Sequence, residues 1–147
     1  MEARSLKIST KGRYALRVMI DLAEQNSDEY IPLKAIAKRQ EISEKYLESI
    51  IVVLSKAGFV DGMRGKGGGY KLTRPAEGYT VGSILRLIEG PLVPVSCLER
   101  KPVTCSRAAQ CRTLPLWSKL DQLVNDYLDS VTVADLIRTE DGGDYVI

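Results

Sequence analysis

The sequence predicts a mainly helical α+β chain with one small β-hairpin and one long helix towards its C-terminus. Apolar residues recur at three- and four-residue steps in five segments, which is the period of a helix with one buried face. Two short strand-like runs flank a glycine-rich stretch. A chain of 147 residues has room for one compact core, or for a small domain with an appended helix.

Each helix begins after a capping residue or ends at a glycine or a polar turn. Thr10 is expected to cap the first helix, Ser43 the third and Thr80 the fourth, because short polar side chains accept a hydrogen bond from a free N–H of the first turn. Gly58 and Gly90 are expected to end the third and fourth helices. The predicted helices span residues 11–25, 33–39, 44–57, 81–89 and 114–129, and Thr132 caps a short last helix.

Residues 59–63 and 69–73 read as the two strands of a hairpin. The loop between them, Arg64-Gly65-Lys66-Gly67-Gly68, combines two cations with three glycines, which tolerate unusual backbone angles. Residues 92–112 show no periodicity and are expected to form a loop that holds all three cysteines. The chain then divides into a first domain over 1–90, a cysteine-bearing segment over 91–112 and a C-terminal part over 113–147.

Composition limits the function classes. With 44% hydrophobic residues, and with neither a continuous apolar run nor an export signal, we expect a cytoplasmic protein without a membrane partner. Residues 1–74 carry 14 Lys and Arg against 9 Asp and Glu, whereas 75–147 carry 7 against 10. The basic excess therefore lies in the first half, as a phosphate-binding surface requires, although ordinary solvated surfaces also reach this value.

Helix, turn, helix and a basic hairpin follow one another in the order of a winged helix-turn-helix domain, which binds double-stranded DNA. Lys45, Tyr46 and Glu48 lie at the start of the third helix, whose N-terminal residues would meet base edges in the major groove. Arg64 and Lys66 of the hairpin loop suit the narrow minor groove. The competing interpretation is an ordinary solvated helix face.

A second set of polar residues surrounds the start of the first helix and is expected to hold backbone phosphates, unless these side chains are merely solvated. They are Lys7, Ser9, Thr10 and Lys11. The glycine-rich loop is not a nucleotide phosphate loop, because it joins two strands and opens no helix. An enzyme is disfavoured, since the chain has no histidine, no nucleophile motif and no paired carboxylates on a shared face.

Four motifs occur in order at familiar spacing: KISTKGRYALRVMIDLA, ISEKYLESI, RGKGGGYKL and ILRLIEGPLVPV. Through them the chain resembles the Rrf2 superfamily of winged-helix transcription regulators over about residues 6–137. This superfamily includes iron–sulfur cluster regulators, nitric-oxide sensors and repressors of cysteine metabolism. The resemblance implies a homodimer on a palindromic operator, recognition-helix roles for Lys45, Tyr46 and Glu48, a wing role for Arg64 and, for the cysteine-metabolism type, a regulatory partner protein.

The family resemblance implies that the long helix over 114–129 is the dimerisation helix. It also carries more apolar surface than a domain of about 70 residues covers, as a dimer seam requires, although a helix packed inside its own subunit is the alternative. The expected dimer residues are Leu116, Trp117, Leu120, Leu123 and Tyr127.

Cys97, Cys105 and Cys111 are an odd number of cysteines in an expected reducing compartment, and all lie in one short segment, so metal or redox chemistry fits better than disulfides. The resemblance implies that all three hold an iron–sulfur cluster with two or four irons. The fourth ligand of cluster-binding relatives is missing: Leu114 stands at the histidine position, and Arg13 at the aspartate position of nitric-oxide sensors. Glu99, a bound thiol, water or no ligand remain open, as do a cluster-free thiol switch and inert cysteines.

Overall fold

The structure, a computed structural model, describes residues 7–25, 28–99 and 107–137. Its mainly helical fold with one antiparallel hairpin confirms the predicted fold class. Within these ranges, no helix combines the length and the apolar composition that a membrane span requires. The elements are α1 (Thr10–Gln25), α2 (Leu33–Gln40), α3 (Glu44–Lys56), β1 (Val60–Met63), β2 (Gly69–Leu72), η1 (Ala76–Gly78), α4 (Val81–Glu89), η2 (Ser96–Leu98), η3 (Ala108–Gln110), α5 (Leu114–Ser130) and α6 (Val133–Ile137).

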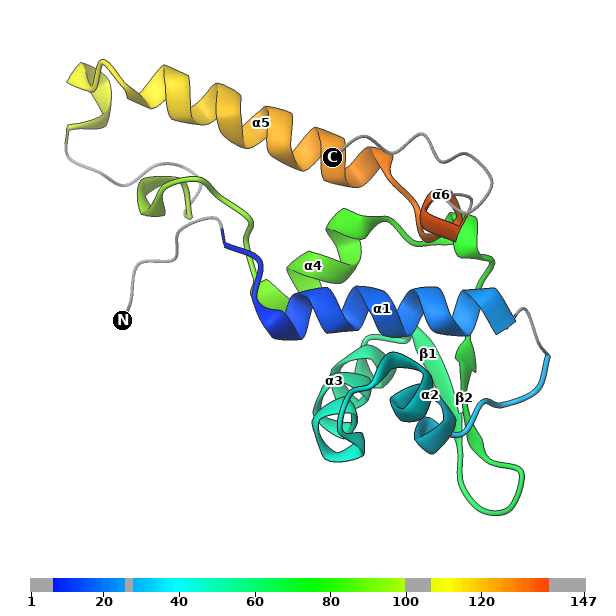
Figure 1. Cartoon of the computed structure of the whole chain (residues 1–147). Helices are drawn as coiled ribbons and strands as arrows, with labels where there is room; N and C mark the ends of the chain where they lie inside the picture. Colours follow the sequence, from blue (N-terminus) through cyan, green and yellow to red (C-terminus); the bar gives the residue numbers. More distant parts are fainter. Residues whose placement is uncertain (1–6, 26–27, 100–106, 138–147) are drawn as a thin grey trace.

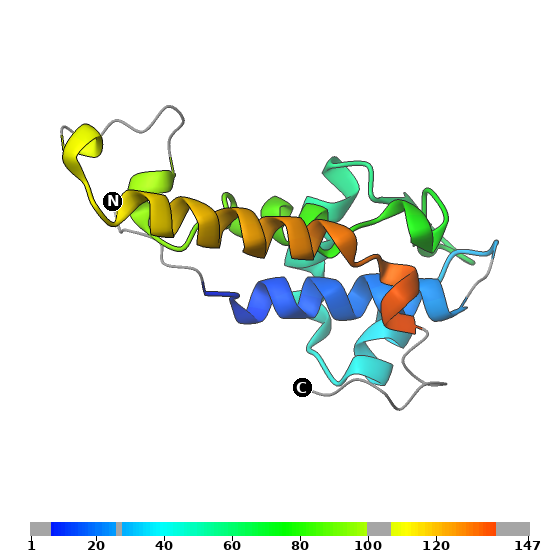
Figure 2. The same ribbon diagram turned by 90° about the horizontal axis from the view of Figure 1, so that it is seen from above.

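Helix α1 is the centre of the molecule (Figure 1). It packs against α2, α3 and β2 on one side and against α4 and α6 on the other. The main core lies between these elements, and its fully buried side chains include Met19, Ile36, Leu47, Ile50 and Ile84. Helix α5 lies outside this core against α4, and Figure 2 shows its N-terminal end reaching beyond the start of α1.

The hairpin pairs β1 with β2, from Val60 opposite Leu72 to Met63 opposite Gly69. A feature that the sequence did not reveal is a third backbone partner. Ile31 exchanges two hydrogen bonds of 2.8 Å with Tyr70, N–H to carbonyl in both directions. Gly69 makes this close approach possible, because a Cβ at that position would lie 2.2 Å from the Ile31 carbonyl oxygen.

Helix caps mostly follow the prediction. The hydroxyls of Ser43, Thr80 and Thr132 accept hydrogen bonds of 3.0–3.1 Å from N–H groups three residues later. The cap predicted at Thr10 is wrong. Ser9 is the cap, because its Oγ accepts the Gly12 N–H at 3.0 Å and its carbonyl accepts the Arg13 N–H at 3.0 Å.

An ion pair between buried Asp21 and exposed Arg39 joins α1 to α2. Asp21 is 1% exposed, and its carboxylate accepts two hydrogen bonds from Arg39, at 2.8 and 3.1 Å, and one from Gln40 at 2.8 Å. The hydrogen bond to Asp21 raises the pKa of Arg39. Glu41 then ends α2 in the left-handed region, at φ 55°, so the turn to α3 is set by these contacts and not by a glycine.

Candidate functional site

Helix α3 and the hairpin lie at the same end of the molecule, on the side of α1 away from α5 (Figure 1). Lys45 and Glu48 of α3 are exposed. Tyr46 is half-buried, because its ring packs edge-on against Tyr14 with 5.6 Å between the ring centroids. Of the three predicted recognition residues, Lys45 and Glu48 therefore point freely to solvent, and Tyr46 also supports the helix.

The hairpin loop carries Arg64 and Lys66, both exposed, between glycines in unusual backbone conformations. Gly65 and Gly67 have φ of 94° and 79°, a region that side chains disfavour. Gly68 donates its N–H to the Gly65 carbonyl at 2.9 Å to close the turn. The backbone itself thus requires glycine here, and the two cations project from a thin loop.

Buried Tyr79 anchors the base of the hairpin. Its hydroxyl donates to the Phe59 carbonyl at 2.7 Å and accepts the Thr73 N–H at 2.9 Å. This role of Tyr79 was not predicted from the sequence, since a single tyrosine before a helix cap carries no local signal of it. Tyr79 therefore ties both ends of the hairpin to the core.

The predicted phosphate-binding residues at the start of α1 lie in different settings. Lys7 and Thr10 are exposed, and Lys11 is partly exposed. Ser9 is engaged within the protein: its N–H and its hydroxyl donate to the Glu89 carboxylate at 2.6 and 2.8 Å. These contacts join the start of α1 to the last residue of α4, directly before the cysteine-bearing segment.

Helix α5 has two different faces. Four of the five predicted dimer residues are exposed large apolar side chains: Leu116 (58%), Leu120 (37%), Leu123 (56%) and Tyr127 (63%). The fifth, Trp117, is half-buried. On the other face Leu128 packs with Val81, Leu85 and Leu92 of the same chain. The intramolecular alternative therefore accounts for one face of α5 and leaves the other uncovered in the single chain.

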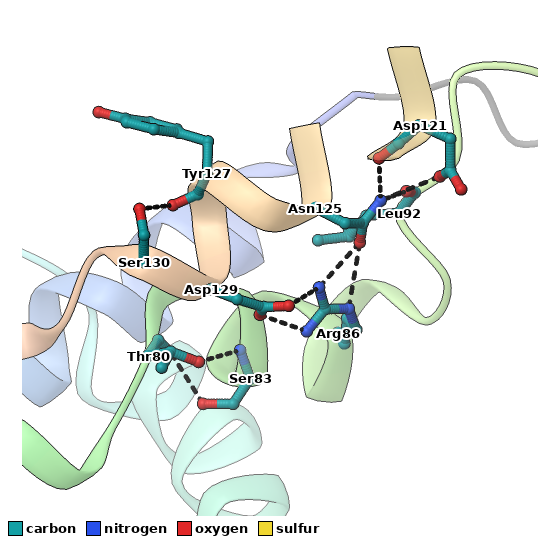
Figure 3. A network of polar contacts seen from close by, with 9 residues as sticks. All are labelled: Thr80, Ser83, Arg86, Leu92, Asp121, Asn125, Tyr127, Asp129 and Ser130. Carbon is teal, nitrogen blue, oxygen red and sulfur yellow. Dashed lines mark hydrogen bonds and ion pairs between the residues drawn. The ribbon is translucent and has the colours of Figure 1, made fainter. Parts of the chain in front are cut away.

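A polar network ties α5 to α4 and to the cysteine-bearing segment (Figure 3). Arg86 of α4 donates to both Asp129 carboxylate oxygens, at 2.8 and 2.9 Å, and to Asn125 Oδ1 at 2.8 Å. The Asn125 amide donates to the Leu92 carbonyl at 2.8 Å and to Asp121. The cysteine-bearing segment is therefore in direct contact with α5 at Leu92.

The segment predicted as a loop contains two short helical turns, η2 and η3, among its described residues. Cys97 lies in η2 and is exposed; Cys111 follows η3 and is partly exposed. The Cys111 thiol lies 3.4 Å from the Thr113 hydroxyl, and this hydrogen bond is the main cause of the lowered pKa of Cys111. Cys105 lies outside the described residues.

The described residues contain no group of three or more His, Cys, Asp or Glu side chains that could hold a metal ion. Arg13 is exposed on α1, and Leu114 is the first residue of α5. Glu99 is half-buried just after η2 and has interactions of its own. Cys97 and Cys111 are thus two thiols of the kind that can bind a soft metal, without a complete metal-binding group among the described residues.

Comparison with known proteins gives one consistent result. Residues 8–139 match the Rrf2 family model, described as an iron-dependent transcriptional regulator. The HTH-type transcriptional regulator IscR of Cereibacter sphaeroides is 40% identical over 139 residues, covering 92% of this chain and 89% of the relative. The corresponding regulator CymR of Bacillus subtilis is 39% identical over 137 residues, covering 93% and 94%.

The fold agrees with the sequence match. The solved structure of CymR (YrzC), the global cysteine regulator of B. subtilis, has a TM-score of 0.75 and 41% identity, covering 90% of this chain and 97% of that chain. The structure of T. potens IscR has a TM-score of 0.71 and 37% identity, covering 97% and 93%. The chain belongs to the Rrf2 family of winged-helix transcriptional regulators.

Proposed function

We propose that this regulator acts in the cytoplasm as a homodimer that binds a palindromic operator through α3 and the hairpin. The observation that carries the proposal is the joint exposure, at one end of the molecule, of Lys45 and Glu48 on α3 and of Arg64 and Lys66 on the glycine loop. The helix fits the major groove, and the thin loop fits the minor groove. Its named relatives are transcriptional regulators and not enzymes.

The other proposed DNA contacts are supporting ones. Lys7, Thr10 and Lys11 would hold backbone phosphates and add affinity without specificity. The Ser9 side chain already donates to Glu89 and caps α1. Its proposed contribution to DNA binding would therefore be indirect, by holding the start of α1 in position. Tyr46 offers only its exposed part to a base, because its ring packs on Tyr14.

Binding to DNA is tested with an operator selected from random duplexes, by measuring the dissociation constant at several salt concentrations. Affinity should fall with a log–log slope of about −0.9 per phosphate contacted. Arg64→Ala should cost about 1–3 kcal/mol if the guanidinium reads a base. Lys119→Ala, which removes one exposed cation from α5, is the control and should change little. A flat response to salt would instead favour a surface for protein contacts.

Dimerisation is proposed from the exposed face of α5. A closed twofold dimer uses the same patch on both subunits, and the stripe from Leu116 to Tyr127 offers such a patch. The two recognition helices would then meet half-sites about one helical turn apart, or a multiple of that distance.

We further propose that Cys97, Cys105 and Cys111 hold an iron–sulfur cluster with two or four irons. Support comes from the similarity to IscR proteins, from the exposure of Cys97 and from the lowered pKa of Cys111, since the thiolate is the form that binds metal. A hydrogen bond from Asn125 of α5 to the Leu92 carbonyl links the cysteine-bearing segment to α5. A shift of that link would change the spacing of the two recognition helices.

A second candidate is a cluster-free regulator of sulfur metabolism controlled by a thiol switch, a metabolite or a partner protein. The absence of histidine from the chain and the similarity to CymR favour it. Anaerobic purification with iron and sulfide assays separates the two candidates. Stoichiometric iron that is lost in Cys97→Ala, Cys105→Ala and Cys111→Ala supports the cluster. An iron-free wild type that binds its operator even after attempted reconstitution supports the second candidate.

Operator affinity then tests the switch itself. Holo protein and a variant without cysteines should differ in affinity if the cluster controls DNA binding. Equal affinities would leave a cluster without a regulatory role.

A further inference from the structure

Two large apolar side chains are exposed outside α5, and both border the same groove. Among the described residues the exposed large hydrophobics are the four on α5, together with Val52 (46%) and Met63 (48%). The groove lies between α3 and the hairpin, with Glu44 and Glu48 also at its border. The α5 residues have a dimer seam to explain them, whereas Val52 and Met63 lie at the opposite, proposed DNA-binding end.

Val52 is central on the outward face of α3. The inward stripe of this helix consists of Leu47, Ile50, Ile51 and Leu54, all buried. At 3.6 residues per turn the opposite stripe consists of Lys45, Ser49, Val52 and Lys56, all exposed. The Ser49 hydroxyl donates to the Tyr46 carbonyl at 2.6 Å and is thereby turned back onto the helix. Val52 is therefore the most prominent outward side chain of this stripe between Lys45 and Lys56.

The stripe is somewhat longer than the DNA major groove is wide. Lys45 and Lys56 are about 16 Å apart along the helix axis at a rise of about 1.5 Å per residue. The major groove is about 12 Å wide. In a helix whose N-terminal residues meet the base edges, Lys45 stays in the groove, Lys56 lies towards a phosphate-lined rim, and Val52 lies between them, facing the base edges.

We propose that Val52 is a specificity-determining residue that contacts the C5-methyl group of a thymine in each half-site; this inference rests on the proposed DNA binding. The thymine methyl is the apolar group that base pairs present in the major groove, while the other edges present hydrogen-bond donors and acceptors. Valine cannot form hydrogen bonds with those edges. A base that places a donor or acceptor against Val52 therefore loses its hydrogen bond to water and gains none from the protein.

The test is a thermodynamic cycle on the selected operator. Each thymine is replaced in turn by uracil, which removes only the methyl group, and dissociation constants are measured for anaerobically prepared wild type and Val52→Ala. In the wild type, one uracil in each of the two half-sites should weaken binding about fifteenfold, the equivalent of about 0.8 kcal/mol for each of the two methyl groups removed. Val52→Ala lacks the two γ-methyl groups, so its affinity should differ much less between the two operators.

Folding does not confound this measurement, because alanine favours a helix more than valine does, and thermal unfolding of the variant verifies it. Met63→Ala, on the hairpin side of the protein groove between α3 and the hairpin, is the matched control and should keep the sensitivity to uracil. The inference is overturned if no thymine is sensitive, if Val52→Ala keeps the sensitivity, or if Met63→Ala loses it instead. Failure of the proposed function looks different, since the wild type would then select no operator at all.

Discussion

Replacing Leu123 by glutamate should dissociate the proposed dimer. Leu123 is 56% exposed in the single chain, so about half of its surface is available to a partner. Full burial of a leucine is worth about 1.5–3 kcal/mol, and half of that, counted on both subunits, again gives about 1.5–3 kcal/mol. An unpaired carboxylate in an apolar seam adds about 2 kcal/mol or more. The sum, about 3.5–5 kcal/mol, weakens the dimer on the order of a thousandfold.

Sedimentation equilibrium over a dilution series measures this change. Gln122→Glu is the matched control, because it adds the same charge one residue away, on a side of α5 that borders the groove with Leu92 and Val93 and faces away from the apolar stripe. Leu123→Glu should be monomeric where wild type and Gln122→Glu are dimeric. The reasoning is refuted if Leu123→Glu stays dimeric at these concentrations, or if Gln122→Glu dissociates equally.

Three further perturbations follow from particular contacts. Arg39→Met leaves Asp21 buried with only Gln40 as partner. Because Arg39 is 39% exposed, we expect the free energy of unfolding in urea to fall by about 2–3 kcal/mol, less than for a fully buried pair. Arg39→Met combined with Asp21→Asn should lower it by less than the sum of the single changes, and strict additivity would contradict the coupling. Glu41→Gly should raise the free energy of unfolding by about 1 kcal/mol by relieving its left-handed backbone, and a destabilised variant would contradict this. Thr113→Val removes the hydrogen bond that lowers the pKa of Cys111, so the pH profile of Cys111 alkylation in the apo protein, followed by peptide mass spectrometry, should move to higher pH; an unchanged profile would assign no role to Thr113.

The elements that the sequence predicted well are those with local causes. Helical periodicity and caps such as Ser43 and Thr80 depend on residues three or four positions apart, so their signal is contained in a short window. The same locality explains the one wrong cap. Ser9 and Thr10 are both good capping residues, and the contact of Ser9 with Glu89, 80 positions away, accompanies the choice of Ser9.

Long-range contacts were beyond the sequence for the same reason. Nothing near Ile31 predicts its pairing with Tyr70, and nothing near Asp21 predicts that it is buried against Arg39. The Arg86–Asn125–Leu92 network joins three segments that are distant along the chain. Such pairs are selected by the packing of whole helices, and no spacing rule describes them.

By itself the sequence determined that this protein has a helix-turn-helix, a basic glycine hairpin, three clustered cysteines and a long amphipathic helix, since composition and period alone specify these features. Only the tertiary structure decided which residues each surface offers. It turned Tyr46 and Ser9 partly inward and left Val52 exposed beside the hairpin. It also divided α5 into a packed and an uncovered face. The physical reason is that exposure depends on which neighbours arrive from elsewhere in the chain.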